Sequence, residues 1–87
     1  MSVHIPARAE DLPELAGIGE RILARRHLLG MSRRDLVRHT GLGEAHLLNI
    51  ERGLRIPGAG SLVRLHRALG CSVDYLLGLT DSPSLRS

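Results

Sequence analysis

Residues 32–53 read SRRDLVRHTGLGEAHLLNIERG, and this stretch decides the fold. Ser32 is suited to cap a helix, because its hydroxyl accepts a hydrogen bond from a backbone amide of the first turn, and Asp35 follows at the position that completes a capping box. We expect this helix to end before Gly41, since glycine adopts at low cost the positive φ that terminates helices. A second helix then runs as far as Gly53. The stretch therefore predicts two short helices joined by a tight turn.

The second of these helices has an inner and an outer face. Leu47 and Ile50 are three residues apart and Leu54 follows four residues later, so the three fall on one side of a helix. When that side faces a core, the outer side carries Glu44, Ala45, His46, Leu48 and Asn49. Two helices this short do not bury their apolar sides on each other alone. The rest of the chain therefore has to provide a scaffold.

The composition favours an all-α domain. The 87-residue chain contains one Tyr, no Trp and no Phe, and it lacks runs in which β-branched residues alternate with polar ones. A core of Leu, Ile, Val and Ala suits packed helices better than packed sheets. A chain of this length has room for one small domain. We expect a flexible N-terminal arm over 1–10, the domain over 11–79 and a flexible tail over 80–87.

Three more helices are predicted, and the first precedes the central pair. It begins near Asp11, a capping residue, and stops at Gly30. Gly17 and Gly19 each cost about 1 kcal/mol relative to alanine in a helix interior. A short extra turn, followed by a helix from about Ile18, therefore fits the sequence equally well.

Apolar spacing selects the buried side of these scaffold helices. In the first helix the buried stripe consists of Leu15, Ile18, Ile22 and Leu29. Arg21, Arg25 and Arg26 point away from that stripe. The two later helices cover 61–69 and 72–77. The prediction is a bundle of five helices in total.

Charge is concentrated in the middle of the chain. All twelve basic residues are arginine, and the formal net charge is +3. Residues 17–69 hold ten arginines against four carboxylates, whereas both flanking segments are net negative. This distribution is expected of a domain that faces phosphate, although a solvated charged surface is the alternative interpretation.

Several classes of protein find no support in the sequence. The single cysteine, Cys71, rules out an internal disulfide, and we expect it to be a small buried residue. No apolar run is long enough for a membrane span, and no signal peptide is evident. The five histidines lack metal-ligand spacing, and no nucleotide-binding loop follows a strand. We therefore expect a cytoplasmic protein that is not an enzyme and needs no cofactor or metal.

Four segments in the same order give the chain a family resemblance. They read IGERI (18–22), GMSRRDLV (30–37), IERGLRIP (50–57) and LHRALGCSVDYLLGL (65–79). From about Ile18 to Leu79 the chain resembles the Cro/repressor-type, or XRE-type, lambda-repressor-like helix-turn-helix domain. Glu51, Gly53 and Pro57 match the family pattern E-x-G-x-x-x-P. The chain departs from the family where Arg33 replaces a common glutamine and Gly43 replaces a capping serine or threonine.

The resemblance implies a bacterial or phage-encoded DNA-binding regulator. Its expected form is a repressor that binds double-stranded DNA as a homodimer on a two-fold symmetric operator. Base contacts are expected from the outer face of the second helix, namely Glu44, Ala45, His46, Leu48 and Asn49. Phosphate contacts are expected from Arg33, Arg34, Arg38, Gly43, Arg52 and Arg55. Independently of the resemblance, the apolar side chains at the end of the chain exceed what a small core needs, so we expect a dimer interface at Tyr75, Leu76 and Leu79. The alternative is that these residues only close the five-helix core.

Some of these roles have alternatives. Glu44 is suited to accept a hydrogen bond from cytosine, but a carboxylate is also favoured at a helix N-terminus by the helix dipole. Glu51 is expected to be structural, paired with an arginine or bonded to a backbone amide. Leu48 on the outer face is compatible with a protein contact. The rival functions are therefore a protein-interaction module that reuses the fold with a protein partner, and an antitoxin-type autorepressor.

Overall fold

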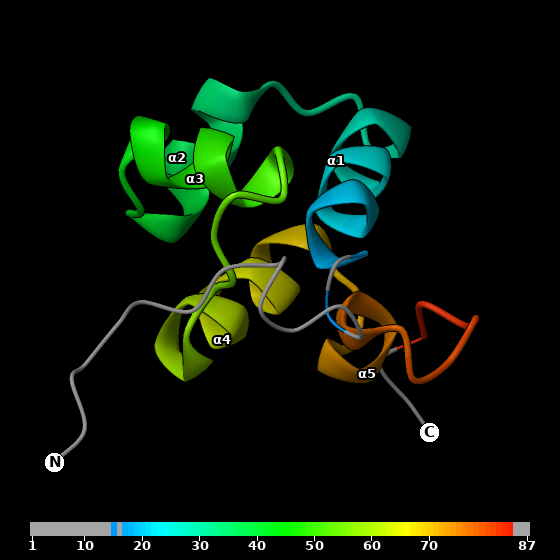
Figure 1. The fold of residues 1–87 in the computed structure, drawn as a ribbon. Helices are drawn as coiled ribbons and strands as arrows, with labels where there is room; N and C mark the ends of the chain where they lie inside the picture. The colour runs from blue at the N-terminus through cyan, green and yellow to red at the C-terminus, as the bar shows by residue number, and fades with distance from the viewer. Residues whose placement is uncertain (1–14, 16, 85–87) are drawn as a thin grey trace, which may run out of the picture.

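The computed structural model describes residue 15 and residues 17–84, and this part of the chain contains five helices and no strand. The helices are α1 (Ile18–Leu28), α2 (Arg33–Thr40), α3 (Glu44–Glu51), α4 (Ala59–Leu69) and α5 (Val73–Leu77), as Figure 1 shows. The predicted all-α fold with five helices is confirmed. The predicted arm, the cap at Asp11 and most of the extra N-terminal turn lie outside the described residues.

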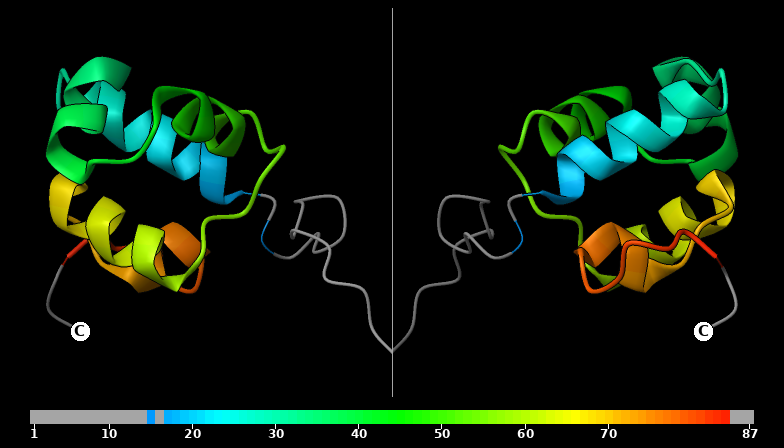
Figure 2. Two further views of the ribbon diagram at one scale, coloured as in Figure 1. Left: turned by 90° about the vertical axis from the view of Figure 1, so that its left-hand side faces the viewer. Right: turned by 90° about the vertical axis from the view of Figure 1, so that its right-hand side faces the viewer.

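The helices form two layers. The turned views in Figure 2 place α1, α2 and α3 in one layer and α4 and α5 in the other. Helix α1 packs against α3, α4 and α5, while α2 packs against α3 and α4. The segment after α5 returns to this second layer, where the amide of Ser72 donates to the carbonyl of Pro83 at 3.1 Å.

A small aliphatic core lies between the layers. Its nine buried members come from every helix and from the α4–α5 junction: Ile18, Ile22, Leu36, Leu47, Ile50, Leu65, Leu69, Cys71 and Leu76. Two leucines predicted to be buried are not. Leu29 is 45% exposed because it follows the last turn of α1, and Leu54 is 54% exposed because the chain turns at Gly53 before reaching it. The core is therefore smaller than the leucine spacing indicates.

Gly19 explains the glycine-rich start of α1. Helix α1 begins at Ile18, which confirms the predicted alternative of a helix that starts there, and Gly19 is buried within it. A Cβ atom at this position would lie 2.1 Å from the carbonyl oxygen of Ile50 and 2.9 Å from that of Glu51. The missing side chain lets the backbones of α1 and α3 approach closely. The residue that weakens α1 as an isolated helix is thus required by its packing.

Arginine side chains hold the C-terminal ends of three helices. Arg21 donates from Nη1 to the carbonyl of Leu76 in α5 at 3.3 Å, and Arg25 donates from Nε to the carbonyl of Leu69 in α4 at 2.9 Å. Arg64 donates to the carbonyl of Thr40 at the end of α2 at 3.2 Å. A cation is favoured at a helix C-terminus, where the last carbonyls lack helical partners. Part of the arginine content therefore serves the fold.

The α4–α5 junction buries the single cysteine, as predicted. Cys71 is a free thiol with no exposed surface, and burial raises its pKa although the nearby Arg25 guanidinium opposes the shift. Ser72 then caps α5 by accepting a hydrogen bond from the amide of Tyr75 at 3.0 Å. Within the part of the chain that the structure describes, no helix is long and apolar enough to cross a membrane.

We predict opposite effects for alanine at two helical glycines. Gly19→Ala should lower the free energy of unfolding by about 1–3 kcal/mol or more, because the new methyl group meets a backbone carbonyl that has little room to move. Gly60→Ala should raise it by up to about 1 kcal/mol, since a Cβ there meets nothing within 4 Å and alanine favours the helix. Urea denaturation of both variants measures the difference. A neutral Gly19→Ala would contradict the close approach of α1 and α3.

Candidate nucleic-acid interface

The start of α2 is fixed by the predicted capping box. The Oγ of Ser32 accepts from the amide of Asp35 at 3.0 Å, and the carboxylate of Asp35 accepts from the amide of Ser32 at 2.9 Å. These hydrogen bonds to Ser32 lower the pKa of Asp35, with a smaller contribution from the adjacent Arg38 guanidinium. A carboxyl group whose pKa is lower in the folded state stabilises the fold at any pH above the pKa of the unfolded chain. This contribution is lost as the pH falls through the lower pKa of the folded state. The capping box therefore stabilises the folded state at neutral pH, where the carboxylate is ionised.

Thr40 closes the turn between α2 and α3. Its buried hydroxyl donates to the carbonyl of Leu36 at 2.7 Å and accepts from the amide of Leu42 at 3.2 Å. Gly41 adopts a φ of 74°, and its amide donates to the carbonyl of Val37 at 2.7 Å. The chain thus reverses direction within three residues before α3 begins. The turn sets the angle at which α3 leaves α2.

Helix α3 has the two faces that the sequence predicts. Leu47 and Ile50 are fully buried in the core. On the opposite side, Glu44, Ala45 and His46 are exposed, while Leu48 and Asn49 are half-buried. None of the Glu44, His46 and Asn49 side chains has a hydrogen-bond or ion-pair partner within the described residues. These polar side chains of the outer face are therefore available to bind a partner, and the first turn of α3 is exposed to solvent.

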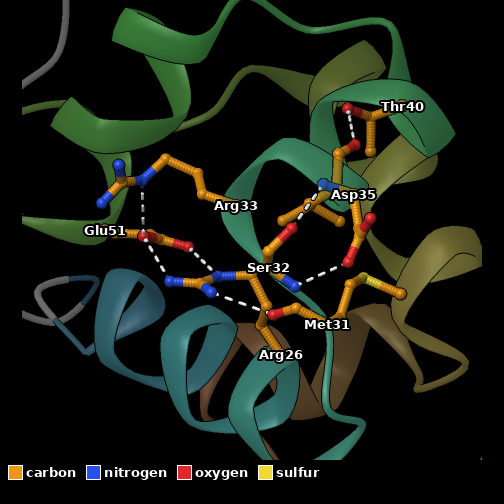
Figure 3. Close-up of polar contacts among 8 residues, drawn as sticks. Arg26, Met31, Ser32, Arg33, Asp35, Thr40 and Glu51 are labelled. Carbon is orange, nitrogen blue, oxygen red and sulfur yellow. Dashed lines mark hydrogen bonds and ion pairs between the residues drawn. The ribbon is translucent and has the colours of Figure 1, made fainter.

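A buried ion-pair cluster ties the end of α3 to α1 and α2. Glu51 in α3 accepts two hydrogen bonds from Arg26 in α1, from Nε at 2.8 Å and from Nη2 at 3.2 Å. The Nη1 of Arg26 donates to the carbonyl of Met31, just before α2, at 2.9 Å. The Nε of Arg33, the first residue of α2, lies 3.4 Å from Oε1 of Glu51. Figure 3 shows the side chains of Arg26 and Arg33 meeting at Glu51, whose predicted structural role is confirmed.

The sequence interpretation placed Arg26 on the wrong side of α1. Arg26 is only 6% exposed, whereas the prediction had it pointing away from the buried stripe. A signal was present, because Ile18, Ile22 and Arg26 follow one another at steps of four. The buried glutamate that neutralises Arg26 lies 25 residues further along the chain. Helical spacing therefore indicates the position, but a charged residue on a buried stripe also needs a partner.

The predicted phosphate-binding arginines differ in the hydrogen bonds and ion pairs that their guanidinium groups already make within the protein. Arg34 and Arg52 are exposed, and their guanidinium groups have no partner within the described residues. Arg55 bonds only the carbonyl of its neighbour Leu54, at 3.4 Å. Arg38 pairs with Asp35 across one turn of α2. Gly43 precedes α3 as its N-cap and has no side chain, so within the described residues no side-chain hydrogen bond caps that end.

The residues predicted to form a dimer interface do not share one environment. Leu79 is 72% exposed and Tyr75 is half-buried. Leu76 is fully buried in the core of the single chain, so its side chain is not part of a surface. The prediction is corrected at Leu76, because α5 needs an inward-facing residue to close the bundle. Tyr75 and Leu79 stay available.

The described residues contain no cluster that would hold a metal ion, that is, no group of three or more His, Cys, Asp or Glu side chains. Of the histidines among the described residues, His66 alone makes a polar contact, with its Nδ1 3.2 Å from the carbonyl oxygen of Cys71.

Comparison with known proteins identifies the family of this chain. Residues 22–76 match the model of the helix-turn-helix family. Over 56 residues the chain is 41% identical to an uncharacterized HTH-type transcriptional regulator, y4dL, of Sinorhizobium fredii, a match that covers 64% of this chain and 29% of that protein. The chain thus spans less than a third of the length of this curated relative.

Two solved structures share the fold. One is the P22 c2 repressor in complex with a synthetic operator, with a TM-score of 0.65 and 37% identity over 68% of this chain and 89% of that one. The other is the restriction-modification controller protein C.AhdI from Aeromonas hydrophila, with a TM-score of 0.68 and 26% identity over 74% of this chain and 97% of that one.

We predict strong coupling between Arg26 and Glu51. Arg26→Met should lower the free energy of unfolding by about 3–5 kcal/mol, because it leaves a carboxylate buried without its partner. Changing Glu51→Leu as well should restore much of that loss, since no unpaired charge is left buried and Arg33 is partly exposed to solvent. Arg38→Met, which removes an exposed pair, should change stability little. Thermal and urea unfolding of these variants and of Glu51→Leu alone measure the coupling, and a double variant whose loss equals the sum of the two single losses would contradict it.

Proposed function

The chain belongs to the XRE-type helix-turn-helix family, and on that basis we propose that it is a sequence-specific DNA-binding transcriptional regulator. We place it among repressors that bind a two-fold symmetric operator as a dimer. The P22 c2 repressor and the restriction-modification controller protein C.AhdI share its fold, which supports this assignment. A role in the cytoplasm of a bacterial or phage-infected cell, without enzymatic activity, completes the proposal.

One observation carries the proposal: the first turn of α3 exposes Glu44, Ala45 and His46, while the inner face of the helix is buried in the core. Leu47, Ile50 and Glu51 are buried and fix the rotation of the helix. The exposed first turn, with Glu44 and His46, then projects away from the domain. A helix presented in this manner fits the major groove of B-DNA, which is wide enough to admit one.

The chemistry of this face limits what it reads. The carboxylate of Glu44 accepts a hydrogen bond from the amino group of cytosine, and the methyl group of Ala45 packs on that of thymine. The amide of Asn49 pairs with adenine, which offers both a donor and an acceptor in the major groove. His46 and Leu48 complete the proposed reading surface. Contacts with the DNA phosphates would set the register of the protein on the duplex. The proposed contacts come from Arg33, Arg34, Arg38, Arg52, Arg55 and the amides beside Gly43.

We predict that the protein selects a defined operator and that its affinity falls steeply with salt. Each phosphate contact contributes a slope of about −0.9 in log K against log salt. Asn49→Ala should weaken binding to the selected site by about 1–3 kcal/mol and leave binding to random DNA unchanged. Arg52→Gln serves as the control, because loss of a phosphate contact should weaken both alike. Selection from genomic fragments, followed by titrations at several salt concentrations, provides the measurement.

The rival function gives a different result in the same experiment. A protein-interaction module would bind every DNA sequence weakly and equally, and Asn49→Ala would have no specific effect. Half-buried Leu48, on the outer face of α3, is the residue that favours this rival. An antitoxin-type autorepressor would bind DNA as proposed and would in addition form a stable complex with a toxin.

We predict self-association through the surface beside α5. Leu79 is 72% exposed, a large apolar side chain next to half-buried Tyr75, and a second copy of the chain would cover both. Leu79→Glu should raise the monomer fraction and weaken binding to a two-half-site operator more than to a single half-site. Sedimentation with and without DNA measures the oligomeric state. A wild-type monomer at high concentration under both conditions would remove the dimer from the proposal.

A further inference from the structure

We infer that Arg33 is a two-point connector, held by Glu51 at Nε and reaching a DNA phosphate with its terminal Nη atoms, so that Glu51 acts as a positioning residue for a backbone contact. The inference rests on the proposed DNA-binding function. It goes beyond a general phosphate contact, because it assigns one arginine a geometry that another cation at the same position would not reproduce.

The cluster contains more positive charge than Glu51 needs. Arg26 alone occupies both carboxylate oxygens, at 2.8 and 3.2 Å, and its third nitrogen is bonded to the carbonyl of Met31. Two guanidinium groups therefore meet one carboxylate, and one positive charge is left over. That surplus charge belongs to Arg33, whose contact with Glu51 is the longest of the three at 3.4 Å.

Exposure separates the two arginines. The side chains of Arg26 and Glu51 are 8% and 4% exposed, whereas that of Arg33 is 33% exposed. The Nε of Arg33 is its one nitrogen with a partner within the described residues, and in Figure 3 it is also the one joined to Glu51 by a dashed line. Both Nη atoms are left to donate elsewhere. Arg26 thus neutralises the buried carboxylate, and the same carboxylate holds the Nε of Arg33 and so orients its Nη atoms.

The position of Arg33 suits a contact at the edge of the reading surface. It is the first residue of α2, and through Glu51 it lies against the last turn of α3. A phosphate beside the groove that α3 enters would complete the coordination of the guanidinium. The side chain would then join the end of the reading helix to the DNA backbone. Such a link fixes the depth and register of α3, which a freely rotating surface arginine does not.

Lysine distinguishes a guided contact from a simple charge. A guanidinium presents five donors in a rigid fork, so one edge can face Glu51 while another faces a phosphate. An ammonium is a point charge on a flexible stem and does not keep that fixed division. Arg34 is the matched control, because it is the next residue, carries the same charge, and has no partner within the described residues.

The test compares lysine and glutamine at the two positions, using the full chain and the operator duplex selected as above. Arg33→Lys should weaken operator binding about tenfold or more, since a charge-assisted hydrogen bond is lost, whereas Arg34→Lys should stay within about twofold of wild type. Arg33→Gln and Arg34→Gln should each flatten the salt dependence by about one contact per half-site. Thermal unfolding of each variant is measured in parallel, and all are expected to stay folded because the Arg26–Glu51 pair is intact.

Three outcomes would overturn the inference. If Arg33→Lys binds the operator with wild-type affinity, Arg33 contributes only a positive charge and not an oriented contact. A lower melting temperature for Arg33→Gln with an unchanged salt dependence would make its role structural. A wild-type protein without salt-dependent DNA binding would overturn the proposed function together with this inference, whereas the first two outcomes leave the proposed function standing.

Discussion

The buried ion pair between Arg26 and Glu51 is the contact on which the arrangement of α1, α2 and α3 depends. Glu51 ends α3, Arg26 belongs to α1, and the same guanidinium bonds the carbonyl of Met31 just before α2. One side chain therefore fixes three helices in a domain whose buried core has nine members. Removing two charges from water is costly unless every donor and acceptor is used. Here the carboxylate and all three guanidinium nitrogens of Arg26 are used, and the contact sets a geometry that apolar packing alone leaves adjustable.

The number of arginines in the sequence overstates how many guanidinium groups are available at the surface to bind a phosphate. The middle of the chain holds ten of them, yet Arg21, Arg25 and Arg64 bond helix C-terminal carbonyls and Arg26 is buried. These groups still carry charge, but each already donates at least one hydrogen bond within the protein. The groups available near α3 are fewer, chiefly Arg34 and Arg52. Arginine is well suited to both tasks, because its fork bonds carbonyls and phosphates with the same geometry.

Local chemistry could be read from the sequence, and tertiary contacts largely could not. The capping box at Ser32 and the buried pair Leu47 and Ile50 depend on neighbours within one turn, so residue type and spacing predict them. The outer face of α3 follows from the same spacing. The partner of Arg26 lies in another helix, and the close approach at Gly19 involves the backbone of α3. Neither leaves a local pattern, because each is a property of two segments that meet only after folding.

Helix α1 has a consequence for how the domain opens. Its arginines reach α3, α4 and α5, and its glycine lies against the backbone of α3. A domain whose elements make mainly pairwise contacts can lose one element at a time, whereas here the release of α1 frees four attachments together. The slowest amide hydrogen exchange should then be shared by α1 and the helices it holds, as one cooperative unit. A regulator built this way would expose its short helices to proteases chiefly by unfolding as a whole, so that its cellular lifetime would follow its overall stability.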